Sequence, residues 1–315
     1  MITSLNFNYE ISEPIKRNNI TVFFINSKNK IKSNILSFNE GLNNNLISVS
    51  EINKTGSVNY LKVDNPSNFK ILILDSEQII GNTLKQDRIV DATTLISEKS
   101  VTHLKVSCCE RNRWSRFTSN EIYLSKSLFF SKGRMNNSNE IFSNYKTDQY
   151  KIWDDISEKL NELKIRSFTE SSEKLYKQNQ SYIEGIISQF KVNSGDVGCA
   201  IAINEKIISL DIFFDEGLFK EYFPKLLRSV VLESICKNTQ GHYISINSVY
   251  KLIKLFENSE KKMHKTTIGG LGKEIRFNND YVVGSSLEYN NDTIHFSGFV
   301  KEMPKIPNFN ESKVA

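Results

Sequence analysis

Glutamate, arginine and tryptophan side chains occur together in one short string, Cys-Cys-Glu-Arg-Asn-Arg-Trp at residues 108–114. A glutamate can act as a general acid or base, an arginine can bind a phosphate through two parallel hydrogen bonds, and a tryptophan can stack on a base. The string therefore makes Glu110 a candidate catalytic residue, and it makes Arg113 and Trp114 candidate ligand-binding residues. The structural alternative is a buried Glu110–Arg113 ion pair with Trp114 filling the core.

A second group of polar side chains follows the apolar run at residues 69–74. Glu77, Gln86 and Arg88 supply a carboxylate, an amide and a guanidinium, which are groups that bind ribose hydroxyls and phosphates. Glu77 is the second candidate acid–base residue, and Gln86 and Arg88 are candidate ligand-binding residues. The alternative is that all three close their own loop by hydrogen bonds. If Glu77 and Arg88 share one site with the 108–114 string, the side chains must converge in one cleft.

Two further ligand-binding candidates lie near the C-terminus. Arg276 is one more strand arginine, and His295 alternates with Ser297 along a predicted strand, so it can face a pocket. The alternative for His295 is an ordinary hydrogen-bonded strand histidine. The four histidines include no HxxxH or CxxC pairing, so the sequence predicts neither a metal nor a cofactor. The glycine-rich run at 269–274 departs from a phosphate-binding loop, because a strand begins at Glu274 where that loop requires a helix.

Two adjacent cysteines end an alternating strand at residues 101–109. Cys108 shares the apolar face of this strand, which predicts an inert, buried thiol. The same alternation places Cys109 on the more exposed face. A nucleophilic pairing of Cys109 with His103 or His295 is disfavoured, because no histidine follows the cysteine nearby in the sequence.

The elements that must position these residues fall into three regions. Residues 1–145 form a β-rich part, 146–192 a helical connector with a central helical pair, and 193–303 an α+β part, followed by a frayed tail at 304–315. The N-terminal strands are predicted at 20–25, 46–51, 58–63, 69–74 and 101–109. Strands that segregate from helices along the chain predict an α+β fold rather than a doubly wound parallel sheet.

Local signals fix several element ends. Ile152, Ile156 and Leu160 follow helical spacing after an N-cap at Thr147 or Asp148. A second helix of the pair spans 182–190. Downstream, an Asn-Glu turn at 204–205 joins two strands into a hairpin, and an aspartate at 215 caps a long amphipathic helix.

Bulk composition narrows the class of protein. Among 315 residues, 39% are hydrophobic and 24% are charged, which is typical of a globular chain and excludes a disordered one. The formal net charge of +5 is spread along the chain, so there is no strong nucleic-acid signal, although a few aimed arginines can still bind a small phosphorylated ligand. No signal peptide and no apolar run of membrane length occur, which predicts a soluble, cytoplasmic protein with reduced thiols.

Several strings together resemble one known family. The chain is similar to the ADP-ribosylglycohydrolase- and rhodanese-phosphatase-associated protein domain, an uncharacterised prokaryotic family, and its most specific part is the Cys-x-Glu-x-x-Arg-Trp string. Ser76 and Asn112 stand where that family tends to have glycine. The matching strings lie at 61–67, 73–81, 86–88, 106–114, 197–203, 210–213, 224–229, 274–276 and 295–299.

The resemblance implies a function without proving one. The family is named for genomic neighbours, several of them linked to ADP-ribose chemistry and prokaryotic conflict systems. Together with Arg88, Arg113 and Arg276, it implies a nucleotide-binding or sensing domain for an ADP-ribose-type ligand in a conflict or stress system. One alternative is a metal-independent hydrolase or transferase with Glu110 or Glu77 as acid or base, and another is a structural interaction module. The partners left open are a small nucleotide, a second copy of the chain and another protein.

Overall fold

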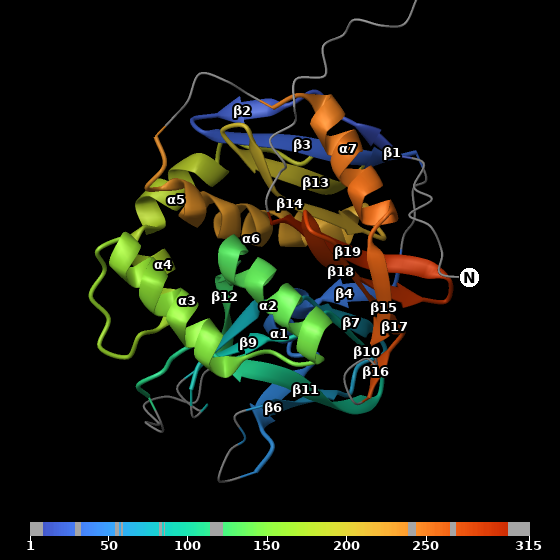
Figure 1. Ribbon diagram of the computed structural model, residues 1–315. Helices are drawn as coiled ribbons and strands as arrows, with labels where there is room; N and C mark the ends of the chain where they lie inside the picture. The colour runs from blue at the N-terminus through green and yellow to red at the C-terminus, as the bar shows by residue number, and fades with distance from the viewer. Residues whose placement is uncertain are drawn as a thin grey trace, which may run out of the picture.

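Three β-sheets and seven helices build the described part of the chain (Figure 1). The computed structural model describes residues 9–28, 33–53, 57, 59–81, 84, 86–113, 122–238, 244–264 and 269–301. Within these ranges every strand pair is antiparallel except β4 with β7. A doubly wound parallel sheet is thereby excluded, and the predicted α+β class is confirmed.

The largest sheet has nine strands in the order β1-β3-β13-β14-β19-β18-β17-β15, with β2 also paired to β3. It joins N-terminal strands to C-terminal ones, because β3 pairs along its length with β13. The apolar sequence of β3 is buried on both faces, which suits a strand inside a sheet. The three predicted regions therefore describe the order of elements along the chain, while this sheet is shared between the first and the third. Its strands are β1 (Tyr9–Ile11), β2 (Ile15–Arg17), β3 (Ile20–Ser27), β13 (Asp196–Ile203), β14 (Lys206–Phe213), β15 (Glu260–His264), β17 (Lys273–Asn278), β18 (Val282–Tyr289) and β19 (Asp292–Val300).

The two smaller sheets come almost entirely from the N-terminal half. One has the order β16-β10-β7-β4 and the other the order β12-β8-β9-β11-β6-β5. Two of the predicted strands appear as β7 and β11, and β11 alternates between buried and more exposed positions as expected. The strands are β4 (Ile35–Ser37), β5 (Ser48–Glu51), β6 (Tyr60–Asn65), β7 (Lys70–Ile73), β8 (Glu77–Gly81), β9 (Arg88–Val90), β10 (Thr94–Ile96), β11 (Ser100–Cys108), β12 (Ile122–Leu128) and β16 (Gly270–Leu271).

Four consecutive helices separate β12 from β13, and they include the predicted pair as α3 and α5. Asp148 caps α3 by accepting from the backbone N–H of Tyr150 and Lys151, and Asp215 caps α6 by accepting from Leu218. Both caps were predicted, and both supply an acceptor to the unpaired first turn. The helices are α1 (Phe38–Asn43), α2 (Ser131–Asn144), α3 (Gln149–Glu162), α4 (Ser172–Gln178), α5 (Gln180–Ile187), α6 (Glu216–Ser234) and α7 (Ile246–Glu257).

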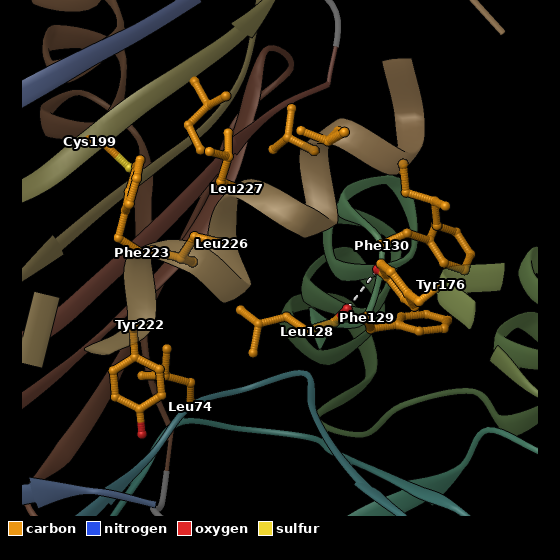
Figure 2. Packing of buried hydrophobic residues seen from close by; sticks show 14 of the residues in the cluster. Leu74, Leu128, Phe129, Phe130, Tyr176, Cys199, Tyr222, Phe223, Leu226 and Leu227 are labelled. Atoms are coloured by element: carbon orange, nitrogen blue, oxygen red, sulfur yellow. Dashed lines mark hydrogen bonds between the residues drawn. The ribbon is translucent and has the colours of Figure 1, made fainter. Parts of the chain in front are cut away.

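The main hydrophobic core lies between the nine-stranded sheet and the helices α3 to α6. Figure 2 shows α6 side chains such as Phe223 and Leu226 packed beside Cys199 of β13, with Phe129, Phe130 and Tyr176 nearby. The Tyr176 hydroxyl donates a 2.7 Å hydrogen bond to the backbone carbonyl of Leu128, so its polar atom is satisfied within the core. On the other face of the sheet, α7 packs a separate apolar cluster. Because side chains alternate between the two faces of the nine-stranded sheet, each strand directs one set of residues toward α6 and the other set toward α7.

Candidate functional site

A row of polar side chains crosses the nine-stranded sheet on the face covered by α2. Residues paired directly across an antiparallel ladder project from the same face, so the register places all five on one surface. The first four are buried and the fifth is partly exposed. We call this set the polar row. Its members, strand by strand, are Asp211 on β14, Ser297 on β19, Ser285 on β18, Arg276 on β17 and Lys262 on β15.

Arg134 of α2 packs on the polar row and contacts two of its members, Asp211 and Ser297. Its Nη2 donates to Asp211 Oδ1 at 3.2 Å and to Ser297 Oγ at 3.0 Å, and it lies 3.8 Å from Asp75 Oδ2. Burial alone lowers the pKa of the guanidinium, but the carboxylates of Asp211 and Asp75 outweigh it and raise the pKa, so Arg134 stays charged. Arg134 is 1% exposed, and its Nε and Nη1 have no hydrogen-bond partner among the described residues.

The turn between β7 and β8 brings two carboxylates to the same layer. Asp75 accepts a 3.1 Å hydrogen bond from Thr93 Oγ1, and Glu77 forms a 2.6 Å ion pair with Lys225 of α6. Between them Ser76 has a φ of +67°, a left-handed conformation that favours glycine. Glycine would adopt this conformation without strain. The strained turn aims both carboxylates into the space between the sheets.

His295 joins the two sides of this layer. Its Nε2 lies 3.4 Å from Asp211 Oδ1, and its Nδ1 lies 3.4 Å from Thr93 Oγ1. Together with Glu274, the partner of Arg276, these residues form what we call the inter-sheet polar layer. It comprises the polar row and Arg134, Asp75, Glu77, Thr93, Lys225, Glu274 and His295.

Two carboxylates in the inter-sheet polar layer have pKa values shifted in opposite directions. Burial raises the pKa of Glu77, and the nearby Lys225 only partly opposes that shift. Burial also acts to raise the pKa of Asp211, but Arg134 and His295 outweigh it and lower the pKa overall. Carboxylates held in such contrasting environments can divide acid and base roles between them.

Three sequence-predicted site residues therefore share this layer: Glu77, Arg276 and His295. The structure adds residues that sequence patterns did not single out, above all Arg134, Asp211 and Asp75. Asp211 offered one signal, since it lies between the apolar residues Leu210 and Ile212 of a strand, and a buried carboxylate at such a position needs a partner.

The remaining candidates form contacts elsewhere. Arg113 donates from Nε to Glu110 Oε2 at 2.5 Å, from Nη2 to Asp87 Oδ1 at 2.7 Å and from Nη1 to the Leu84 carbonyl at 3.2 Å. The Glu110–Arg113 ion pair of the structural alternative is thus formed, and all three guanidinium nitrogens of Arg113 are engaged by the protein. Gln86 donates to the Glu110 carbonyl at 3.1 Å.

Among the described residues, no hydrogen bond or ion pair joins Arg88 to the inter-sheet polar layer or to the Glu110–Arg113 pair. It is fully buried, lies 3.8 Å from a carboxylate oxygen of Glu51, and donates to the Ser57 carbonyl at 3.4 Å. Glu77, Arg88 and the Glu110–Arg113 pair therefore contact three different sets of partners. Trp114 lies outside the described residues.

Cys109 corrects one expectation. It is fully buried rather than better exposed, because the chain leaves β11 at Cys108 and its backbone bonds to Asp87 and Ser172 hold it beneath the start of α4. Burial raises the pKa of its thiol well above the ordinary value, which opposes nucleophilic activity. Cys108 is buried as predicted.

The Asp87–Glu110–Arg113 cluster gives a prediction about pH. Burial and the neighbouring Glu110 raise the pKa of Asp87 to about 7, and Arg113 opposes them. A raised native pKa stabilises the fold below the unfolded value of ~3.9, and that stability is lost as pH rises through about 7. Between pH 6 and 8 we expect the free energy of unfolding to fall by roughly 1 kcal/mol from this group. In Asp87→Asn that component should vanish in urea denaturation curves, whereas an unchanged slope against pH would contradict it.

Other site classes find no support in the described ranges. No group of three or more histidine, cysteine, aspartate or glutamate side chains there is arranged to hold a metal ion. No helix among these residues is long and apolar enough to cross a membrane.

Comparison with known proteins identifies a family and nothing closer. The sequence model of a family described as the ARG and Rhodanese-Phosphatase-superfamily-associated Protein domain matches residues 8–299. No curated protein and no solved structure gives a significant match.

Proposed function

Because the chain belongs to the ARG and Rhodanese-Phosphatase-superfamily-associated Protein domain family, we propose that it binds or senses a small phosphorylated nucleotide of the ADP-ribose type. Reading ARG as ADP-ribosylglycohydrolase connects the family description to ADP-ribose chemistry. The proposal includes a role in a prokaryotic conflict or stress system, with the nucleotide as the signal. The ligand would occupy the inter-sheet polar layer.

The observation that supports this proposal is the unsatisfied donor capacity of Arg134. Its Nε and Nη1 are buried and lack partners among the described residues, while Nη2 serves both Asp211 and Ser297. Each buried polar group left unpaired costs about 1–3 kcal/mol. The Nε and Nη1 donors point to different sides of the guanidinium, and the several acceptor oxygens of a phosphorylated nucleotide could pair with each of them. Buried water is the competing occupant of such a layer.

A thermal-shift titration tests the proposal. ADP-ribose, NAD and AMP are added in turn, and a true ligand is expected to raise the melting temperature with concentration. At about 100 times its dissociation constant the ligand stabilises the native state by about 2.7 kcal/mol. Arg134→Lys should lose most of this shift, because an ammonium keeps the charge but not the separately directed Nε and Nη1 donors.

The matched control is Arg228→Lys, which changes a partly exposed arginine paired with Glu184 on α5. It should leave the ligand-induced shift intact. If no nucleotide raises the melting temperature, the binding proposal is wrong. If Arg134→Lys and Arg228→Lys respond alike, the ligand binds somewhere other than the inter-sheet polar layer.

The opposite pKa shifts of Glu77 and Asp211 favour a second candidate function, hydrolysis or group transfer on the same class of nucleotide. A protonated Glu77 could donate its proton to a leaving oxygen, while the ionised Asp211 stabilises positive charge. Incubation of each nucleotide with the protein, followed by phosphorus NMR, would detect new products. Glu77→Gln should abolish any turnover and retain binding; no product from any nucleotide would exclude this candidate for the panel.

A further inference from the structure

The polar row ends in a cluster of basic side chains at the edge of the nine-stranded sheet. His264 and Lys262 are two residues apart on β15, so they project from the same face. On the neighbouring strand β17, Arg276 lies directly opposite Lys262, and Glu274 lies opposite His264. Lys105 of β11 approaches from the six-stranded sheet.

Two side-chain nitrogen atoms in this cluster are buried and have no hydrogen-bond partner among the described residues. His264 is 8% exposed and Arg276 is 2% exposed. His264 Nε2 and Arg276 Nε have no hydrogen-bond partner among the described residues. Buried polar atoms are normally paired, so a pair of unsatisfied atoms at one place indicates a missing polar partner.

The surroundings of His264 are electropositive. Burial is the main cause that lowers the pKa of His264, to about 4, and Arg276, Lys262 and Lys105 lower it further. Arg276 and Lys262 keep these effects although each already contacts a carboxylate, Glu274 and Glu260 respectively.

Besides Glu274 and Glu260, the carboxylate of Asp91 lies near Lys105 and Arg276, and that of Asp75 lies near Glu274. Asp91 accepts hydrogen bonds from Ser107 at 2.7 Å and from Thr147 at 3.1 Å. Burial raises the pKa of Asp91 to about 6 and also raises that of Glu274, which weakens their tendency to carry negative charge. What Arg276 Nε lacks among the described residues is a hydrogen-bond acceptor, and an anion beside these cations would supply one.

Tyr145 covers His264 and leaves one ring face open. The two rings are stacked, with centroids 4.6 Å apart and planes 22° from parallel. Tyr145 ends α2 in a left-handed conformation, with a φ of +60°, and is 61% exposed. An exposed aromatic ring beside a basic cluster can serve as a surface on which a nucleotide base stacks.

We propose that His264, Arg276, Lys262 and Lys105 form a phosphate-binding site, with the open face of Tyr145 positioned to stack on an aromatic base joined to that phosphate. The phosphate oxygens accept hydrogen bonds from Arg276 Nε and from the imidazole, and the two lysines add charge. The base-stacking part rests on the proposed nucleotide-binding function. The phosphate part does not, so the two can fail separately.

The test is an NMR titration of the histidine ring protons, with inorganic phosphate as the first probe. A bound anion stabilises the imidazolium, so the His264 midpoint should rise by at least about one pH unit. The resonance is assigned by its loss in His264→Gln. His103, an exposed histidine on β11, is the internal control and should keep its midpoint. A His264 midpoint that stays fixed, or moves only as far as that of His103, overturns the phosphate site.

A matched lysine pair tests the geometry. Lys262→Ala should weaken phosphate binding by roughly tenfold, a loss of about 1.4 kcal/mol. Lys261→Ala should leave it unchanged, because Lys261 projects from the opposite face of β15 and lies over the Phe277 ring. Equal losses in the two variants would reduce the effect to overall charge and contradict the site.

The second probe is AMP, compared with inorganic phosphate. Stacking predicts that AMP binds more tightly, and that Tyr145→Ala removes this advantage without changing phosphate binding. If AMP binds no more tightly than phosphate, the stacking part is wrong. Phosphate binding at His264 without any nucleotide-induced stabilisation would uphold the phosphate site and reject the proposed nucleotide function.

Discussion

Arg134→Met is expected to lower the free energy of unfolding by about 3–5 kcal/mol, because it leaves a buried carboxylate without its cation. Asp211 is fully buried, and Arg134 Nη2 is its 3.2 Å partner. Methionine approximates the length of the lost side chain, so the loss should come mainly from the unpaired charge. Urea denaturation at neutral pH measures it through the midpoint at constant slope.

Two further variants decide the cause of that loss. Arg228→Met removes a partly exposed ion pair with Glu184, and such pairs contribute about 0–1 kcal/mol. The double variant Arg134→Met with Asp211→Asn removes both charges and should recover much of the stability. If Arg134→Met were no worse than Arg228→Met, the inter-sheet polar layer would not depend on this pair.

Local sequence signals were enough for much of the fold. The caps at Asp148 and Asp215, the 204–205 hairpin turn and the alternation along β11 depend on neighbouring residues, so they could be predicted. The assembly of the nine-stranded sheet could not. Its pairing of β3 with β13 is set by contacts between segments distant in sequence, which no local periodicity records.

The polar layer escaped prediction for a related reason. Asp211 and Ser297 become neighbours only through the register of β14 with β19. The helix α2 that covers them was not predicted either, because its buried side includes Arg134, Asn137 and Ser138 rather than an apolar stripe. A helix that packs on a polar surface lacks the signal by which amphipathic helices are recognised. The 108–114 string could be recognised because its residues are adjacent in the sequence. In the structure, however, Glu110 and Arg113 form an ion pair with each other.

The proposed function depends both on residues that the sequence had indicated and on residues that only the structure identifies. Glu77, Arg276 and His295 were candidates from sequence, and the structure places them with Arg134 in one buried layer. Paired carboxylates of which one has a raised pKa are typical of an enzyme, whereas basic side chains beside an exposed aromatic ring are typical of a nucleotide-binding site. The inter-sheet polar layer has the first feature at Glu77 and Asp211, and the basic cluster at its edge has the second at His264 and Tyr145. The nucleotide panel therefore needs both a binding and a product readout.

Lys225→Met should destabilise the fold by about 3–5 kcal/mol at pH 8, and by progressively less as the pH is lowered. Lys225 forms a buried 2.6 Å ion pair with Glu77, whose pKa burial already raises. A raised native pKa means that the group stabilises the fold below its unfolded value of ~4.3, and this stability is lost as pH rises through the native pKa. Removing Lys225 raises the pKa of Glu77 further, so the difference from wild type must grow with pH.

Urea denaturation of both proteins from pH 5 to pH 8 measures that growth directly. Lys177→Met, which changes an exposed lysine 4.0 Å from Glu173, is the control and should differ from wild type by about 0–1 kcal/mol throughout. Adding Glu77→Gln to Lys225→Met should remove the pH-dependent part, because the amide cannot ionise. A loss in Lys225→Met that stays constant across the range would show that Glu77 does not titrate there, and it would remove this carboxyl group as a proton donor or acceptor in the polar layer.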